Sequence, residues 1–480
     1  MPKKRRVPPP ASGPDAPPPP APATPLWRLR LLSIAAGLTL LVVFDLGLRV
    51  FGILPPRDPM QGYAESFERG FSPLVEDGPD HWTIRPDWVN AGESLAAANA
   101  SEPGRLFLVP SFRPARFAKH KAPGTRRIVA LGDSTMFGLF AGADGAFVQL
   151  VARLAERNSA VPVEAINLAC PGWASDRVAN LAPTALGLEP DLVIVYVGHN
   201  ELLGRLAAPA APLRDLSARL LPVSSLYAWA WHWRARRQID SAQARGEDAA
   251  ALAAGQVPVF DPLLLPKEQQ VLPTPREADE ATARYRASLQ RIAARAREAR
   301  VPLLFVVPAA NLLMPPAVSV HPAGFASAAE FDALQQEAQR AFERGDGPAA
   351  LAPLERAIAL SPRFAMAHYW RGTILAAGGR KDEARRAFQH AVDDDARTYR
   401  ISSPLLATLT DVAQETGTPL ADLRPLMHAQ LDFPSAHRLF VDFCHPTKFG
   451  HAVIAQRLLP DVLRLLHPSA QQPSVASPGT

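Results

Sequence analysis

The chain has 480 residues, 48% of them hydrophobic, so it is long enough to bury more than one globular core. The formal net charge is +5, and residues 1–30 alone hold six basic residues against one acidic residue. The rest of the chain is therefore balanced, which excludes a broadly basic surface for nucleic acid. Two cysteines are too few for a disulfide framework or a zinc site, and we expect no metal and no cofactor.

The chain begins with a basic arm that cannot form a core. Residues 1–25 contain eleven of the fifty prolines and are predicted to be disordered. The motif Pro-Lys-Lys-Arg-Arg-Val at residues 2–7 is similar to a nuclear-localisation signal. We interpret it instead as the positively charged flank of a membrane segment, because of the residues that follow.

Residues 26–54 are predicted to form a transmembrane signal-anchor helix. Leu31–Leu54 is mostly apolar, apart from Asp45 and Arg49, and a helix of this length spans about 36 Å. Its uncharged part, residues 31–44, would also suit a signal-peptide core or a buried helix, but no clear cleavage site follows. The preceding positive charges put the arm in the cytoplasm, which predicts a single-pass protein of the bacterial inner membrane with a periplasmic domain.

Two segments have uncertain roles on sequence alone. Residues 55–125 hold several prolines and few periodic stretches, so they form either a small lead-in subdomain or a tether. The insertion at residues 205–275 contains alternating aromatic residues at 227–233, followed by arginines. That cluster would suit a membrane surface, but the alternation favours a lid or a segment that covers the core.

Residues 126–316 are predicted to form the first part of an α/β domain, with a β-α-β-α-β pattern over 127–200 and a further helix and strand after it. Apolar runs at 128–131, 163–168, 191–197 and 302–307 predict buried parallel strands, with helices at 147–157 and 278–298 between them. Such alternation predicts a doubly wound α/β domain. Residues 400–466 return to this pattern and end in a helix over 452–466, before a flexible tail at 467–480.

Residues 317–399 carry an internal repeat. A pattern of small and apolar residues that begins at Ala350 recurs from Ala384, an offset of 34 residues. This period resembles that of tetratricopeptide repeats. Two repeats are fewer than a free-standing solenoid needs, so we expect an all-α insertion packed on the main domain. Binding of a protein partner there is the alternative.

Four short motifs at predicted strand ends supply the groups that ester hydrolysis needs. Ser134 follows the first strand in Gly132-Asp133-Ser134 and offers a nucleophile, near a helix start that favours negative charge. Asp442-x-x-His445 follows the run 439–441, and an Asp three residues before a His can orient its imidazole as the base. Asn200 offers an amide and Gly172 a backbone N–H to an oxyanion.

These motifs, in this order, resemble the SGNH or GDSL-type esterase superfamily, closest to membrane-anchored bacterial members with a tetratricopeptide insertion. The resemblance covers about residues 125–316 and 400–466 and implies a flavodoxin-like three-layer α/β/α sandwich with a parallel sheet. It implies that Ser134 is the nucleophile, His445 the base and Asp442 its orienter. It also implies an oxyanion hole formed by Ser134, Gly172 and Asn200.

The sequence departs from the family at Glu201, where an Asp is usual, and this bears on how Asn200 is placed. His199 is open to a substrate-contact role or a packing role. Cys170 and Cys444 each lie in a motif loop, so a disulfide between them is one hypothesis and two buried thiols the other.

We expect a membrane-tethered extracytoplasmic serine esterase that removes short, acetyl-type acyl groups from an ester such as an acylated glycan. The same acyl-enzyme would serve an O-acyltransferase in cell-envelope polysaccharide assembly, which is the first alternative. A non-catalytic scaffold that binds a partner through the repeats is the second, and the complete Ser/His/Asp set argues against it.

Overall fold

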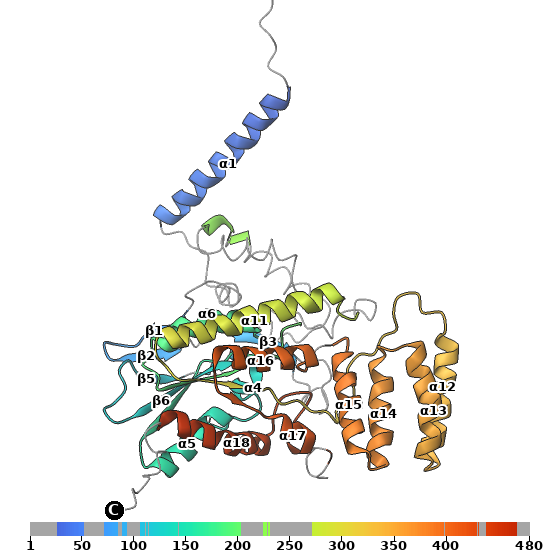
Figure 1. The fold of residues 1–480 in the computed structure, drawn as a ribbon. Coiled ribbons are helices and arrows are strands. Elements are labelled where there is room, and N and C mark those ends of the chain that lie inside the picture. Colours follow the sequence, from blue (N-terminus) through green and yellow to red (C-terminus); the bar gives the residue numbers. More distant parts are fainter. Residues whose placement is uncertain are drawn as a thin grey trace, which may run out of the picture.

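The computed structural model describes residues 26–51, 72–84, 89–93, 106–110, 112–113, 115–142, 144–202, 224–227, 229–230, 271–397, 399–429, 431 and 438–467. The predicted arm at 1–25, most of the insertion at 205–275 and nearly all of the predicted tail lie outside these residues. Figure 1 shows a central sheet covered by helices, with a separate group of helices at one end and one helix extending away.

A parallel sheet of five strands forms the centre, in the order β10-β9-β8-β6-β7. The strands are β6 (Arg126–Gly132), β7 (Val163–Asn167), β8 (Leu192–Tyr196), β9 (Leu303–Val306) and β10 (Leu420–Ala421). Read along the chain this is the 2-1-3-4-5 order of flavodoxin-like folds. The α/β prediction with a parallel sheet is confirmed.

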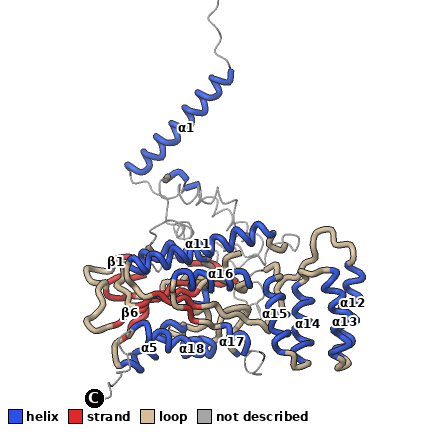
Figure 2. The backbone as a smooth tube through the Cα atoms, in the orientation of Figure 1, coloured by secondary structure: helices blue, strands red, loops and turns tan. Residues whose placement is uncertain are grey.

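Helices cover both faces of this sheet (Figures 1 and 2). One face carries α5 (Phe147–Ser159), α17 (Arg424–Ala429) and α18 (Lys448–Leu466), and the other carries α6 (Ser175–Leu186), α11 (Pro275–Glu298) and α16 (Ser403–Thr416). Strand β8 shows why, because all five of its side chains are buried. Ile194 packs into the first layer and Val193 and Val195 into the second, as the alternation of a strand requires.

One predicted strand is absent from the sheet. The run at 439–441 forms only an isolated bridge, Phe440 with Pro446, because the chain there folds back on itself over six residues. The fifth strand of the sheet is β10, which pairs with β9 from Leu420 opposite Phe305. At two residues it was too short to predict from an apolar run.

The lead-in residues that the structure describes form a packed subdomain rather than a tether. β1 (Leu74–Glu76), β2 (His81–Ile84) and β5 (Arg116–Ala118) make an antiparallel sheet, and β3 (Val89–Glu93) pairs with β4 (Leu106–Pro110). Ile84, Phe112 and Phe117 are buried in the same core as the second face of the central sheet.

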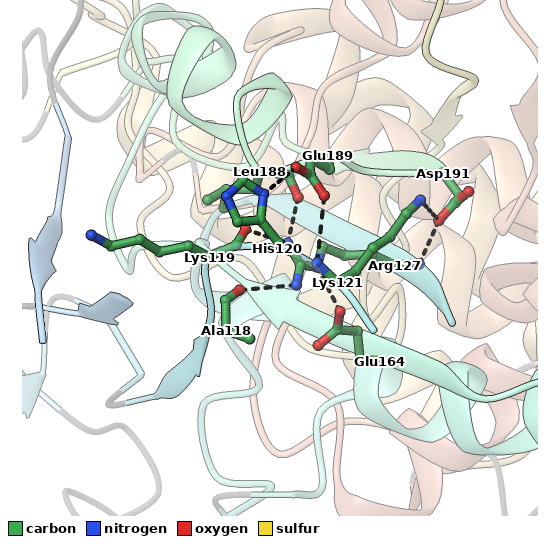
Figure 3. Close-up of polar contacts among 9 residues, drawn as sticks. All are labelled: Ala118, Lys119, His120, Lys121, Arg127, Glu164, Leu188, Glu189 and Asp191. Carbon is green, nitrogen blue, oxygen red and sulfur yellow. Dashed lines mark hydrogen bonds and ion pairs between the residues drawn. The ribbon is translucent and has the colours of Figure 1, made fainter. Parts of the chain in front are cut away.

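A buried arginine fastens this subdomain to the amino-terminal end of β6 (Figure 3). The Arg127 side chain is 0% exposed and donates to Glu164 Oε1 at 2.6 Å and to the carbonyls of Ala118 and Leu188 at 3.0 and 2.7 Å. Nearby, Asp191 accepts from Lys121 Nζ at 2.6 Å. The sheet, the lead-in and the turn before β8 are therefore joined by charge-assisted hydrogen bonds.

Four helices stand beside the sheet domain: α12 (Ala328–Glu343), α13 (Gly347–Leu360), α14 (Ala365–Ala377) and α15 (Lys381–Asp393). We call residues 328–393 the helical segment. The small residues of the sequence repeat are buried in it, among them Ala350 and Ala384. A Cβ at Gly372 would lie 2.8 Å from the Phe388 ring, so glycine allows α14 and α15 to approach closely. Assignment to the tetratricopeptide family stays a prediction.

At the amino-terminal side, α1 (Leu26–Val50) forms over the predicted membrane segment. Among the described residues, however, no helix meets the length and apolarity needed for a membrane crossing. The predicted transmembrane span is therefore not supported by the structure. Asp45, one of the two charged residues in that segment, accepts hydrogen bonds from Ser224 Oγ at 3.2 Å and Leu226 N at 2.5 Å.

Candidate active site

The structure brings Ser134, His445 and Asp442 together. His445 Nε2 lies 2.7 Å from Ser134 Oγ, and His445 Nδ1 lies 2.6 Å from Asp442 Oδ2. The two ends of this chain of hydrogen bonds are more than 300 residues apart in sequence, so only the fold unites them. Ser134 is 7% exposed and the His445 side chain 18%, which leaves the pair open enough to meet a substrate.

Ser134 sits at the first position of the short helix α4 (Ser134–Phe137), directly after β6. Asp133 caps this helix through its side chain, which accepts from Thr135 N at 2.9 Å. Burial raises the pKa of Asp133 to about 7, even though that hydrogen bond and the charge of His445 favour its carboxylate. The cap holds the nucleophile at the carboxyl edge of the sheet, where α/β folds bind ligands.

The loop that carries the base and its acid is closed by its own hydrogen bonds. Val441 N donates to the carbonyl of His445 at 2.8 Å, and Asp442 Oδ1 accepts from Cys444 N and His445 N at 3.0 and 2.9 Å. Burial favours a neutral Asp442, but the charge of His445 and these bonds outweigh it, so its pKa is lowered. Asp442 is therefore a fixed carboxylate that accepts from Nδ1.

The pKa of the His445 imidazole is shifted in the opposite direction to that of Asp442. Burial disfavours its charged form, but the carboxylate of Asp442, with a smaller contribution from Asp133, outweighs this, and the pKa of His445 is raised. With Nδ1–H donated to Asp442, Nε2 is the atom that accepts the Ser134 proton. This arrangement has the geometry of an activated serine nucleophile.

Gly172 and Asn200 lie on the loops that follow the two strands flanking β6. Because β7 and β8 are parallel to β6, these loops share one edge of the sheet with Ser134. Gly172 has a φ of 76°, in the left-handed region that favours glycine. Asn200 is 8% exposed, and one of its amide N–H groups donates to the carbonyl of Trp173 at 3.1 Å, which ties the two loops together.

Glu201, the departure from the family pattern, reinforces this tie. Its two carboxyl oxygens accept from Ser175 N and Ser175 Oγ, both at 2.8 Å, at the start of α6. Burial raises the pKa of Glu201 to about 8, although the bonds from Ser175 act in the other direction. The extra methylene of glutamate thus reaches the loop of Gly172 and keeps Asn200 in place.

His199 packs in the core. It is 2% exposed, its Nδ1 accepts from Ile401 N at 3.2 Å, and its Nε2 lies 3.3 Å from Tyr196 Oη. Burial lowers its pKa to about 3, so it is a neutral imidazole at physiological pH. Of the two roles that the sequence left open, the structure favours packing.

The disulfide hypothesis is wrong, because Cys170 and Cys444 are both buried thiols that form no disulfide with each other. Cys444 instead sits between Asp442 and His445, and the three donor atoms lie within 4.8 Å of one another. Both ring nitrogens of His445 already face Ser134 and Asp442, so these groups serve the triad rather than a metal site. Burial raises the pKa of the Cys444 thiol well above its usual value.

Two residues at the site had no signal that sequence reasoning used. Asn167, at the end of β7, donates to the carbonyl of Met136 at 2.9 Å and accepts from Ala169 N at 3.1 Å, which joins the nucleophile helix to the Gly172 loop. Phe140 stands edge-on to His445, with ring centroids 5.6 Å apart. Its φ of 66° is unusual for a bulky residue and marks local strain.

Comparison with known proteins agrees with this site. Residues 130–338 match the model of the GDSL-like Lipase/Acylhydrolase family, a range that includes Ser134, Gly172 and Asn200. No curated protein matched the chain.

The similarity to solved structures is distant. An acetyl xylan esterase named AlAXEase has 12% identity over 70% of this chain and 99% of that one, with a TM-score of 0.32. The lipase/acylhydrolase of Enterococcus faecalis has 13% identity over 70% and 95%, with a TM-score of 0.31. The acetylxylan esterase of Geobacillus stearothermophilus has 11% identity over 70% and 94%, with a TM-score of 0.33. The match of residues 130–338 to the GDSL-like Lipase/Acylhydrolase family and the geometry of the site together support a serine hydrolase that acts on ester bonds.

Proposed function

We propose that the protein is a membrane-tethered, extracytoplasmic esterase that hydrolyses short-chain, acetyl-type esters through Ser134, His445 and Asp442. The single observation that carries the catalytic part is the continuous contact from Ser134 Oγ through the His445 ring to Asp442 Oδ2, at 2.7 and 2.6 Å. Each contact is short enough for direct proton transfer or charge-assisted hydrogen bonding.

In the acylation step, Ser134 Oγ attacks the ester carbonyl carbon while His445 Nε2 takes the hydroxyl proton. Asp442 stabilises the imidazolium that forms, and the oxyanion of the tetrahedral intermediate accepts from the N–H groups of Ser134 and Gly172 and the Asn200 amide. Collapse breaks the ester C–O bond, and His445 returns the proton to the leaving alcohol. The acyl group is then bonded to Ser134 Oγ.

In the deacylation step, His445 takes a proton from water, whose oxygen attacks the acyl carbon. The bond to Ser134 Oγ breaks, His445 returns the proton to the serine and a carboxylic acid leaves. If a sugar hydroxyl replaces water at this point, the product is a transferred acyl group. Product analysis with an oligosaccharide acceptor therefore separates the esterase from the O-acyltransferase alternative.

The short-acyl preference is supported by the position of Phe140. Its half-buried ring stands edge-on against the His445 imidazole, where it would limit the space for an acyl chain on Ser134. An acetyl group needs less room there than a longer chain. Hydrolysis rates for a series of p-nitrophenyl esters from acetyl to octanoyl test this, and a maximum at octanoyl would reject it.

Tethering through α1 is supported by its apolar surface and by the basic residues before it. Large side chains stand exposed along this helix, among them Leu40, Val42 and Phe44 at 69%, 68% and 58%. Exposed apolar surface of this kind marks a contact with lipid or protein. Ser224 and Leu226 contact Asp45 near the end of α1, which places the start of the aromatic cluster beside it.

Fractionation of cells tests the tether. We expect the full chain in the inner-membrane fraction, with residues after 55 accessible to protease from the periplasm. Recovery in the soluble fraction would reject tethering but would leave the esterase assignment untouched.

Turnover of p-nitrophenyl acetate by the full chain tests the esterase. We expect a Ser134→Ala variant to lose nearly all activity, by about 10⁴-fold or more, as triad serines do. An unchanged rate in this variant would reject Ser134 as the nucleophile and would favour the scaffold alternative.

A further inference from the structure

The loop between Asp442 and His445 is contacted by the residues that precede and follow the helical segment in the chain. Asn311, which precedes that segment, donates its backbone N–H to the carbonyl of Phe443 at 2.9 Å and its side-chain amide to the carbonyl of Asp442 at 3.2 Å. Asn311 Oδ1 also accepts from Leu313 N at 3.1 Å. The Asn311 side chain thus bonds both to its own loop and to the Asp442–His445 loop.

The residues that follow the helical segment contact the same loop. The Arg400 guanidinium lies over the Phe443 ring at 5.2 Å, and the Tyr399 ring lies 5.9 Å from it. Arg400 also donates to the carbonyls of Asn311 and Met314, at 3.1 and 2.8 Å. Phe443 lies between Asp442 and His445 in the loop. It is therefore contacted both by Asn311, before the helical segment, and by Arg400, after it.

A buried ion pair within residues 395–401, after the helical segment, also binds the backbone of residues 317–318, before that segment. Arg400 Nη2 lies 3.1 Å from Asp395 Oδ2, and both side chains are 2% exposed. Asp395 also accepts from Ala317 N and Val318 N at 2.9 and 3.0 Å. Removal of either partner would leave a buried charge uncompensated, which is costly.

Ile401, which also follows the helical segment, contacts the loop that carries Asn200. Ile401 N donates to His199 Nδ1 at 3.2 Å, directly before Asn200. A Cβ at Gly198, whose φ is 149°, would lie 2.6 Å from the end of the Ile401 side chain. From inside the helical segment, Tyr369 Oη of α14 donates to the carbonyl of Leu313 at 2.9 Å.

We propose that residues 311–318 and 395–401 form a clamp through which the helical segment holds the Asp442–His445 loop and the Asn200 loop in catalytic position. The inference rests on the proposed function and deepens it. Asn311 and Arg400 are positioning residues, since they contact the backbone or ring of the loop and not the reacting atoms. Any partner that moves the helical segment would, through this clamp, change the rate of acylation.

Four variants of the full chain, assayed with p-nitrophenyl acetate, test the clamp. We expect Asn311→Ala and Arg400→Met to lower kcat by about 10–100-fold, as small misplacements of catalytic groups do, with KM nearly unchanged. Tyr369→Phe removes one hydrogen bond from within the helical segment and should lower kcat by about fivefold. Arg363→Gln is the control, because it breaks an exposed 2.9 Å pair with Asp394 in the same segment and should leave kcat unchanged.

Thermal unfolding of each variant is measured in parallel, and kcat is expressed per folded molecule. If Arg400→Met does not fold, Asn311→Ala and Tyr369→Phe decide the outcome. Wild-type kcat in folded Asn311→Ala, or a rise in KM alone, would overturn the clamp. An inactive wild-type protein would instead reject the proposed function, so the two failures are distinguishable.

Discussion

At the scale of single residues, the chemistry of the site depends on two carboxyl groups whose surroundings shift their pKa values in opposite directions. The pKa of Asp442 is lowered, because its hydrogen bonds and His445 outweigh burial, whereas burial raises the pKa of Glu201 to about 8. The first is a charged partner for a base, and the second is a neutral structural group at physiological pH.

The pH dependence of the rate follows from His445. Because its pKa is raised above 6.5 and catalysis needs the neutral ring, kcat/KM should rise with pH through one ionisation above that value. Asp442 and Asp133 are the acidic groups that raise it, and His199 is a neutral neighbour. An Asp442→Asn change should lower kcat/KM by about 10³–10⁴-fold and move the midpoint down. A profile that is flat from pH 5 to 9 would contradict this assignment.

Glu201 makes a separate prediction for stability. The folded protein holds a proton on Glu201 up to about pH 8, whereas the unfolded chain releases it near 4.5, so the stability that this group contributes falls as pH rises between those values. Glu201→Gln keeps a neutral hydrogen-bonding group and should remove that fall.

Urea unfolding of wild type and Glu201→Gln at pH 5 and pH 8.5 measures the effect. The difference in unfolding free energy should move in favour of the variant at the higher pH, and Glu343→Gln, an exposed change, should show no such trend. A difference that stays constant across the two pH values would count against a neutral Glu201.

The grouping of Ser134, Asp442 and His445, and the position of the Gly172 and Asn200 loops beside them, were predictable because each lies in a short motif directly after an apolar run. The disulfide was not a safe prediction, since proximity in two loops does not fix the geometry that a bridge needs. Asn167, Phe140 and Arg400 could not be found, because their roles come from contacts with residues that are distant in sequence or from backbone strain. Glu201 was identified as a departure, but its bond to Ser175 required the fold.

At the scale of elements, the turn after α4 shapes the space beside His445. Gly138 and Phe140 both have positive φ, at 80° and 66°, and Arg113 of the lead-in donates to the carbonyls of Phe137 and Gly138. The Arg113 guanidinium also lies 4.5 Å from the centre of the Phe137 ring. The lead-in thus braces the turn that presents Phe140.

Shortening Phe140 should therefore widen the acyl preference. We expect Phe140→Ala to raise the ratio of hexanoyl to acetyl ester hydrolysis by about tenfold, a typical value for an enlarged apolar pocket. Phe449→Ala, which removes an exposed phenylalanine from α18, is the matched control. An unchanged ratio in Phe140→Ala would show that this ring does not limit the acyl chain.

The main elements of the sheet were predictable from apolar runs, because buried parallel strands such as β8 leave a continuous signal. The two-residue β10 leaves none, and the apolar run at 439–441 predicts a strand although the chain there forms one side of a closed loop. Helix boundaries such as that of α18, which begins at Lys448 rather than 452, depend on the Thr447 cap.

At the scale of the whole molecule, the lead-in, the sheet domain and the helical segment are joined by buried polar contacts. Arg127 joins the lead-in to the sheet (Figure 3), and Arg400, just after the helical segment, donates to the carbonyl of Asn311 and lies over the Phe443 ring. Both are arginines, whose planar group can satisfy several carbonyls at once. The site is therefore built by parts of the chain that a boundary drawn from sequence would separate.

Adjacent arginines allow a matched test of this joint. Arg127→Met leaves Glu164 and the carbonyls of Ala118, Lys119 and Leu188 without this donor and should cost about 3–5 kcal/mol of unfolding free energy. Arg126→Met removes a partly exposed contact to Asp191, 2.9 Å long, and should cost about 1 kcal/mol or less. Equal losses in urea unfolding would contradict the structural role of Arg127.

The most direct measurement of the central claim is labelling of the full chain with a fluorophosphonate, followed by mass spectrometry of its peptides. We predict one covalent adduct, on Ser134, that His445→Ala abolishes and that increases in rate as pH rises through the ionisation of His445. Absence of any adduct on Ser134 in the folded wild-type chain would contradict the account.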